Sequence, residues 1–183
     1  LPISLYNENY SQPHLPTESG VEGLSVEEAI VRGMYRVQAG EPGAGVPRVQ
    51  LLGSGPMVRT VLEAQAMLRD QWQVQADVWS VPSYQQLRVD GLEVERWNRL
   101  HPQEAPRRCY VQQCLASSEG PVVAVSDFMK AVPDQIGRFV GRSFTPLGTD
   151  GYGFSDVRPA LRRHFEIDAA HVVVAALAAL AAE

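Results

Sequence analysis

Short apolar runs bounded by turn residues alternate along this chain with longer segments of helical spacing. Residues 49–52 and 144–147 are mostly apolar and residues 122–125 are wholly so, and all three segments predict strands. Residues 57–68, which follow the first run after a Gly-Ser-Gly-Pro turn, carry apolar side chains three or four positions apart and predict a helix. Parallel strands need crossovers, and crossover helices cover a sheet face, so this alternation predicts a three-layer α/β/α domain with a mostly parallel sheet.

Further elements follow from spacing and caps. Residues 74–78 alternate apolar and polar side chains, which predicts a strand with unlike faces. Pro82 and Ser83 open a mostly polar helix that runs past Trp97 toward Leu100. Nearer the start, Ser25 and Glu28 form a capping box, and the spacing of the apolar residues that follow predicts a helix ending near Gly40.

The carboxyl-terminal third predicts two helices. Ser155 is the expected cap of the first, with an inward stripe of Val157, Leu161 and Phe165, and Asp168 is the expected cap of the second. Residues 172–182 are apolar throughout but fall well short of the ~20 residues that a bilayer requires. We therefore expect a buried terminal helix. Residues 1–6 predict a short strand before a Pro-rich connection.

Composition and charge exclude several classes of function. The 183 residues include 16 Lys and Arg against 21 Asp and Glu, a net charge of −5, so nucleic acid and anionic membrane are poor partners. Cys109 and Cys114 lack companions at zinc-ligand spacing and are expected to be buried free thiols, which favours an intracellular location. The four histidines and the serines near turns form no metal-binding motif and no nucleophile elbow.

The Gly53-Ser54-Gly55 turn lies between a strand and a helix, where N–H groups can hold a phosphate. A dinucleotide fingerprint needs a third glycine where Val58 stands, and a P-loop needs Gly-Lys-Ser/Thr. A tight structural turn is the favoured interpretation, and an anion site is the alternative.

A second glycine-rich loop, residues 148–153, follows a predicted strand at the edge where open α/β sheets place ligands. Asp150, Gly151 and Gly153 are its candidate functional residues. The favoured interpretation is that the glycines supply positive φ angles and that Asp150 bonds within its own turn.

Charges of both signs surround Trp97 on its predicted helix. A solvated face with local ion pairs is the default interpretation of Glu93, Glu95, Arg96 and Arg99. A subunit contact anchored by Trp97 and Arg99 is the alternative.

Several segments, in this order, resemble one family: Asn-Glu-Asn-Tyr at 7–10 and residues 49–55, 77–83, 95–102 and 147–153. Together they are similar to the carboxy-terminal domain of homodimeric pyruvate dehydrogenases, and residues 126–130 and 164–168 extend the likeness over nearly the whole chain. The Gly-Ser-Gly turn and the 148–153 loop are shared more broadly with transketolases. One departure is Phe154, where the family often carries a basic residue.

The resemblance implies a five-stranded, mostly parallel mixed sheet with one antiparallel strand, as in transketolase C-terminal domains. Residues 1–24 are then a linker and lead-in from an upstream domain, and residues 25–183 are the domain itself. In such enzymes thiamine diphosphate and Mg²⁺ bind between the first two of three domains, across a homodimer interface. The metal–diphosphate motif and the activating glutamate context are absent here, so we expect no catalytic, cofactor-binding or metal residue in this chain.

The implied parent enzyme is a cytoplasmic oxidoreductase that decarboxylates pyruvate and passes an acetyl group to the lipoyl group of an acyltransferase component. This chain is then an assembly domain, which predicts an apolar or aromatic patch where residues 1–10 cross toward the other domains. One alternative is an independent anion- or nucleotide-binding regulatory module that uses the loops at Gly53 and Asp150. Another is the same domain of a transketolase or of a different 2-oxo acid dehydrogenase.

Overall fold

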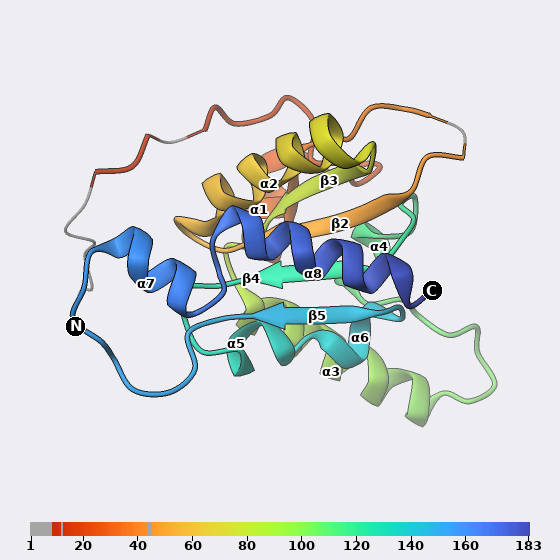
Figure 1. The fold of residues 1–183 in the computed structure, drawn as a ribbon. Coiled ribbons are helices and arrows are strands. Elements are labelled where there is room, and N and C mark those ends of the chain that lie inside the picture. Colours follow the sequence, from red (N-terminus) through yellow and green to blue (C-terminus); the bar gives the residue numbers. More distant parts are fainter. Residues whose placement is uncertain (1–8, 12, 44) are drawn as a thin grey trace.

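A computed structural model describes residues 9–11, 13–43 and 45–183, and the predicted strand at residues 1–6 lies outside them. Five strands form one sheet in the order β1-β3-β2-β4-β5 (Figure 1). Only β1 is antiparallel to its neighbour; the other pairs are parallel. The strands are β1 (Tyr35–Gln38), β2 (Arg48–Gly53), β3 (Gln75–Ser80), β4 (Val122–Val125) and β5 (Phe144–Leu147).

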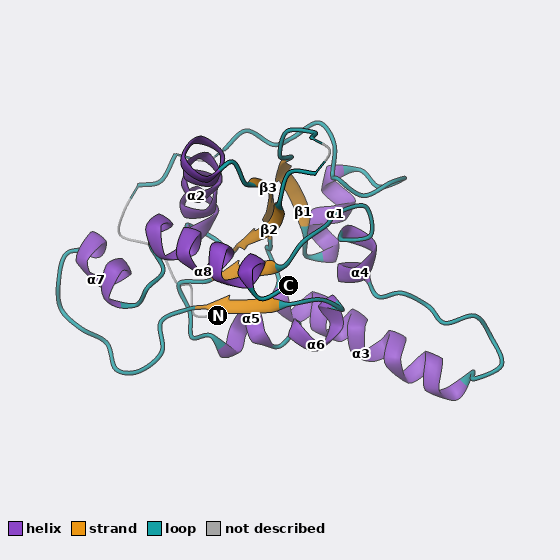
Figure 2. Ribbon diagram, turned by 45° about the vertical axis from the view of Figure 1, so that its right-hand side comes forward, coloured by secondary structure: helices purple, strands orange, loops and turns teal. Residues whose placement is uncertain are grey.

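Helices cover both faces of this sheet, as Figures 1 and 2 show, so the predicted three layers are confirmed. α2 and α8 pack on one face, and α3, α4 and α6 contribute to a second apolar cluster on the other. Neighbouring residues of β2 divide between the clusters, with Leu51 in the first and Leu52 in the second. Because both faces are covered, β4 is apolar throughout and β2 is buried from Val49 to Gly53, with Gln50 as its one buried polar side chain. The helices are α1 (Val26–Arg32), α2 (Met57–Trp72), α3 (Tyr84–Leu100), α4 (Tyr110–Cys114), α5 (Ala131–Asp134), α6 (Gly137–Val140), α7 (Arg158–His164) and α8 (Ala169–Ala181).

The predicted unlike faces of β3 are wrong at Asp77, which is buried. Its carboxylate accepts hydrogen bonds from the Gly40 N–H at 2.8 Å and from the amide of Gln50 at 2.9 Å. The Gln50 amide oxygen in turn accepts from the Trp79 indole at 2.8 Å. A polar side chain can be buried at this position because it is fully engaged in hydrogen bonds.

The first helix is shorter than its spacing predicts. The capping box of Ser25 and Glu28 is confirmed, but α1 stops at Arg32 because Gly33 adopts a left-handed conformation with φ 99°. The residues expected to continue the helix instead form β1, in which Tyr35 pairs with Ser80. Pairing with the edge of β3 therefore prevails over the helical spacing of the side chains.

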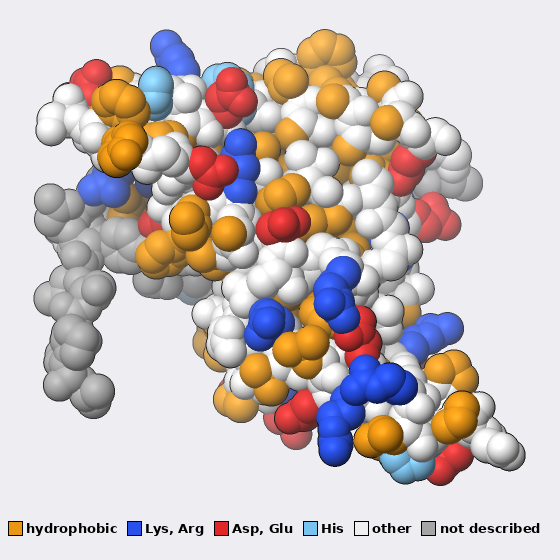
Figure 3. All heavy atoms as spheres, turned by 90° about the horizontal axis from the view of Figure 1, so that it is seen from below, with side chains coloured by type: hydrophobic (Ala, Val, Ile, Leu, Met, Phe, Trp, Pro, Cys, Tyr) orange, Lys and Arg blue, Asp and Glu red, His pale blue; other side chains and the backbone are white. Residues whose placement is uncertain are grey.

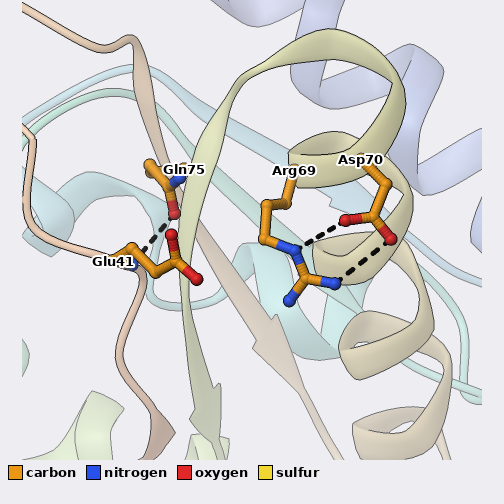
Figure 4. A network of polar contacts seen from close by, with 4 residues as sticks. All are labelled: Glu41, Arg69, Asp70 and Gln75. Carbon is orange, nitrogen blue, oxygen red and sulfur yellow. Dashed lines mark hydrogen bonds and ion pairs between the residues drawn. The ribbon is translucent and has the colours of Figure 1, made fainter.

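Figure 4 shows two polar contacts, one between the loop before β2 and the start of β3 and one within α2. Gln75 accepts a hydrogen bond from the Glu41 N–H at 2.9 Å, which ties the loop before β2 to the start of β3. Arg69 and Asp70 form a two-point ion pair on the exposed side of α2. Exposed pairs of this kind contribute little to stability.

The helix expected after Ser155 is present as α7, but its predicted cap and its predicted buried face are wrong. Its N-cap is Val157 rather than Ser155, and none of its residues is buried. The expected inward stripe fails because Val157 is 67% exposed, while Leu161 and Phe165 are only half-buried. α7 lies beyond the ends of the strands, at the left of Figure 1, where the sheet offers no face to cover it.

The last helix, α8, begins at the predicted cap, where Asp168 accepts from the His171 N–H at 3.0 Å. One side of α8 packs on α2 and β4, whereas Val174 on the other side is 62% exposed. Residues Arg158–Ala181 are long and apolar enough to be a candidate membrane span by length and composition. However, α8 itself has 13 residues. At about 1.5 Å per residue it is about 20 Å long, short of a ~30 Å hydrocarbon core.

Candidate functional site

The carboxyl ends of β2 and β4 meet where the strand order reverses, since β3 lies on one side of β2 and β4 on the other. Open α/β sheets place their ligands at such a point. Here the Ser54 hydroxyl lies 3.3 Å from the Ser126 hydroxyl, and the Ser54 N–H donates to the Val125 carbonyl at 3.2 Å. Ser126 is fully buried, and sequence reasoning treated it only as a serine near a turn. Its position directly after a fully buried strand was the available signal.

The Gly53-Ser54-Gly55 segment has the geometry of a tight structural turn. A Cβ on Gly53 would lie 2.9 Å from Val61 and 3.0 Å from the Met57 backbone, and Gly55 has φ 52°. The Met57 and Val58 N–H groups donate to carbonyls within the turn. These bonds occupy donors that a phosphate would need, so the geometry favours the structural interpretation over the anion site.

The lead-in segment lies over the same turn. Tyr10, Ser11 and Pro13 line a small cavity of about 140 Å³ together with residues of the turn and the first part of α2. The Arg162 guanidinium donates to the Tyr10 hydroxyl at 3.2 Å, and both Arg59 and Arg162 lie about 6 Å from the centre of the Tyr10 ring. The chain's own residues therefore occupy the approach to Gly55.

Asp150 joins two loops rather than bonding within its own turn, so that part of the favoured interpretation is wrong. Its carboxylate accepts from the Lys130 N–H at 2.8 Å, just before α5. Thr149 adds two further bonds, from its N–H to the Phe128 carbonyl at 2.9 Å and from its hydroxyl to the Asp127 carbonyl at 3.0 Å. Gly151 has the predicted positive φ, 97°, whereas Gly153 does not.

Large apolar side chains are exposed on these two joined loops. Five of the ten large hydrophobic residues that are exposed in the described part of the chain belong to them. Figure 3 shows exposed hydrophobic side chains, with polar and charged atoms between them, on the side of the molecule where Figure 1 shows the carboxyl ends of β4 and β5; others lie elsewhere on this face. We call this surface the carboxyl-edge patch; it consists of Phe128, Met129, Tyr152, Phe154 and Val157.

Trp97 lies away from this edge, on the part of α3 that projects from the body at the end opposite α7 (Figure 2). Its ring stacks on His101 at 4.4 Å, and the Arg107 guanidinium lies 3.6 Å from its centre. Both ring faces thus serve to hold the loop after α3. Arg99 is exposed, and Glu95 pairs with Arg138 of α6 rather than within its own helix. The geometry favours a local structural role for Trp97.

The two cysteines are free and buried, as predicted. Burial is the largest influence on both thiols: it raises the pKa of Cys109 and brings the pKa of Cys114 to about 12. Such thiols stay protonated and unreactive at neutral pH. In the part of the chain that the structure describes, no cluster of three His, Cys, Asp or Glu side chains could hold a metal ion.

The order of the strands, together with the hydrogen-bonded loops after β4 and β5, defines a transketolase-type terminal α/β domain. The family model described as the transketolase-like TK C-terminal domain matches residues 33–168, and the chain belongs to this family. Transketolases from Leishmania mexicana and Campylobacter jejuni share the fold. The Leishmania mexicana enzyme has a TM-score of 0.55 at 18% identity, and the match covers 88% of this chain and 20% of that enzyme. The Campylobacter jejuni enzyme has a TM-score of 0.52 at 19% identity, and the match covers 81% of this chain and 19% of that enzyme.

Three curated relatives have higher sequence identity to this chain than these transketolases, and all three are named pyruvate dehydrogenase E1 component. The pyruvate dehydrogenase E1 component of Pseudomonas aeruginosa is 48% identical over 180 residues, which is 98% of this chain and 20% of the relative. Those of Escherichia coli K12 and Mycobacterium tuberculosis are 45% and 44% identical, over 98% and 99% of this chain and 19% of each relative. The chain therefore spans about a fifth of the length of these relatives.

Proposed function

We propose that this chain is the C-terminal domain of a pyruvate dehydrogenase E1 component and serves that enzyme in assembly rather than in catalysis. Identity of 44–48% along nearly all of the chain supports pyruvate dehydrogenase over transketolase, whose structures are 18–19% identical. The carboxyl-edge patch is the observation that carries the assembly role. Exposed apolar clusters of this kind mark surfaces that pack against other protein.

The parent enzyme, on this proposal, is a cytoplasmic homodimer that decarboxylates pyruvate and delivers the acetyl group to the lipoyl group of an acyltransferase component. Thiamine diphosphate, held with Mg²⁺, supplies the electron sink for that decarboxylation. The described residues do not fit the cofactor, because the N–H groups of Met57 and Val58 donate to carbonyls of the Gly53–Gly55 turn and Tyr10 lines the cavity beside that turn. We therefore assign the cofactor to domains that precede this one.

Two measurements test the proposal. The full-length polypeptide that contains this chain is expected to decarboxylate pyruvate in preference to 2-oxoglutarate or a ketose phosphate. The 183-residue chain alone is expected to give no heat on calorimetric titration with thiamine diphosphate and Mg²⁺. Saturable binding of the cofactor by the chain alone would contradict its assignment to other domains, and a preference for ketose phosphate would favour the transketolase alternative.

A further inference from the structure

The carboxyl-edge patch exposes large apolar side chains, and the charged side chains next to them in the sequence, such as Lys130, Asp150 and Asp156, carry both signs. Met129 is 56% exposed and Tyr152 is 90% exposed, so both present most of their surface to solvent. The adjacent charges, Lys130 and Asp150, face each other at 4.0 Å and offset one another. A surface of this character suits an apolar protein partner better than a charged ligand.

Two of the patch residues, Phe128 and Phe154, are held by contacts within the domain. The Phe128 N–H donates to the buried Ser126 hydroxyl at 3.1 Å. Phe154 packs edge-on against His164 of α7 at 4.7 Å, and His164 packs against Phe165 at 5.0 Å. A preorganised surface loses little conformational entropy on docking, which favours a permanent contact.

The chain reaches the domain body beside this surface. Tyr10, close to the first described residue, bonds to Arg162 of α7 and lies against Arg59 at the start of α2. α7 is the helix whose His164 supports Phe154. Tyr10 therefore lies at the edge that carries the patch. The relatives are about five times longer than this chain.

We propose that the carboxyl-edge patch is the docking surface for the preceding part of the same polypeptide, through apolar side chains of that part. This inference rests on the proposed function, since it requires a longer parent chain. The position of Tyr10 favours an intrachain partner over a second copy of this domain. Other exposed apolar residues, such as Val174 on α8 and Trp72 on α2, are not part of this patch.

The test places a benzophenone amino acid at Phe154 of the full-length polypeptide, in dimers assembled from light and ¹⁵N-labelled chains. We expect photo-crosslinks to peptides outside the 183 residues, joining only chains of the same label. The matched control carries benzophenone at Trp72, which is 54% exposed, and should lose those crosslinks. Mixed-label crosslinks would assign the patch to the partner copy, and crosslinks within the 183 residues would assign it to a neighbouring copy of this domain or to the domain itself. Either result overturns the proposal.

A second measurement leaves the protein unaltered. Met129 is exposed in this domain, whereas Met57 is fully buried. In the full-length polypeptide, we expect dilute peroxide to oxidise Met129 as slowly as Met57. Rapid oxidation of Met129, or the absence of any crosslink from position 154, would show an open surface and would also overturn the proposal. Neither readout uses a substrate, so the docking result is independent of whether the parent enzyme acts on pyruvate.

Discussion

At Gly148 the loop after β5 passes so close to the loop after β4 that no side chain fits between them. An added Cβ would lie 2.5 Å from the Phe128 carbonyl oxygen and 2.7 Å from the Lys130 nitrogen. The same approach lets Asp150 reach the Lys130 N–H. One missing methyl group thus allows the bonds that shape the carboxyl-edge patch.

Gly148→Ala is therefore expected to lower the free energy of unfolding by about 2 kcal/mol, the usual cost of overpacking against atoms that cannot move aside. Gly153→Ala is the matched control, because nothing lies within 4 Å of the added Cβ and its φ is not positive. Urea denaturation of both variants measures the difference. Equal losses would show that the loops adjust freely.

Asp168 gives a pH-dependent prediction. Burial alone would raise its pKa, but hydrogen bonds from the His171 N–H and ring, with His171 and Arg163 charges, outweigh burial and lower the pKa below 3.8. When the pKa of a carboxyl is lower in the folded protein than in the unfolded chain, its charge stabilises the folded protein fully at pH values above the unfolded pKa. This stabilisation is lost as the pH falls through the folded pKa.

Asp168→Ala should therefore cost about 1 kcal/mol at pH 7, as expected for a lost N-cap, and progressively less below about pH 4. Asp168→Asn keeps an oxygen to cap α8 but cannot titrate, so its unfolding free energy separates the cap from the charge. Thermal unfolding from pH 7 to pH 3 provides the comparison. A cost that stays constant for Asp168→Ala across this range would exclude the charge contribution.

Among the helices and strands, the sequence predicts those that the spacing of apolar side chains is enough to determine. β2, β4 and β5, and the helices α2, α3 and α8, were expected from their spacing and caps. β1 was missed because its side chains also fit a helix, and only pairing with β3 selects the strand. α7 was placed correctly, but its cap and buried face were wrong because it lies off the sheet. The short helices α4 and α6 have too few residues to show a period.

For the candidate site, the sequence predicted the positions of the two loops but not the contacts between loops. Spacing located the Gly53–Gly55 turn and the Asp150 loop at strand ends, and the resemblance to a known family anticipated a patch. The contacts between loops, Ser54 with Ser126 and Asp150 with Lys130, join residues 72 and 20 positions apart. Such contacts depend on strand order, which local periodicity does not contain.

The polar link between β2 and β3 gives a prediction at the same scale. Gln50→Leu leaves the Trp79 indole N–H and one Asp77 oxygen without their buried partner. At ~1–3 kcal/mol for each of these two unpaired groups, the free energy of unfolding should fall by roughly 2–6 kcal/mol. Gln75→Leu, at the exposed end of β3, should change it little, because the Glu41 N–H that it releases can bind water. Equal effects in urea denaturation would contradict this account of the network.

For the whole molecule, the sheet, the loops and the lead-in converge on one edge. β4 and β5 end there, Tyr10 is held there between Arg59 and Arg162, and the exposed side chains of Phe128, Tyr152 and Phe154 lie on the same loops. A domain that acted alone would gain nothing from this arrangement, since exposed apolar clusters promote association. The same arrangement places an apolar surface on the side of the domain where Tyr10 is held.

This arrangement predicts how the 183-residue chain behaves by itself. With its patch uncovered, it should bind the dye ANS and self-associate at high concentration. The double variant Met129→Lys/Phe154→Lys should lose most of the dye fluorescence and of the association, because each lysine brings a hydrated charge into the patch. Trp72→Lys/Leu100→Lys removes two comparably exposed apolar side chains elsewhere and adds the same charge. If both variants lowered fluorescence and association equally in dye titration and size-exclusion chromatography, net charge rather than the carboxyl-edge patch would control association.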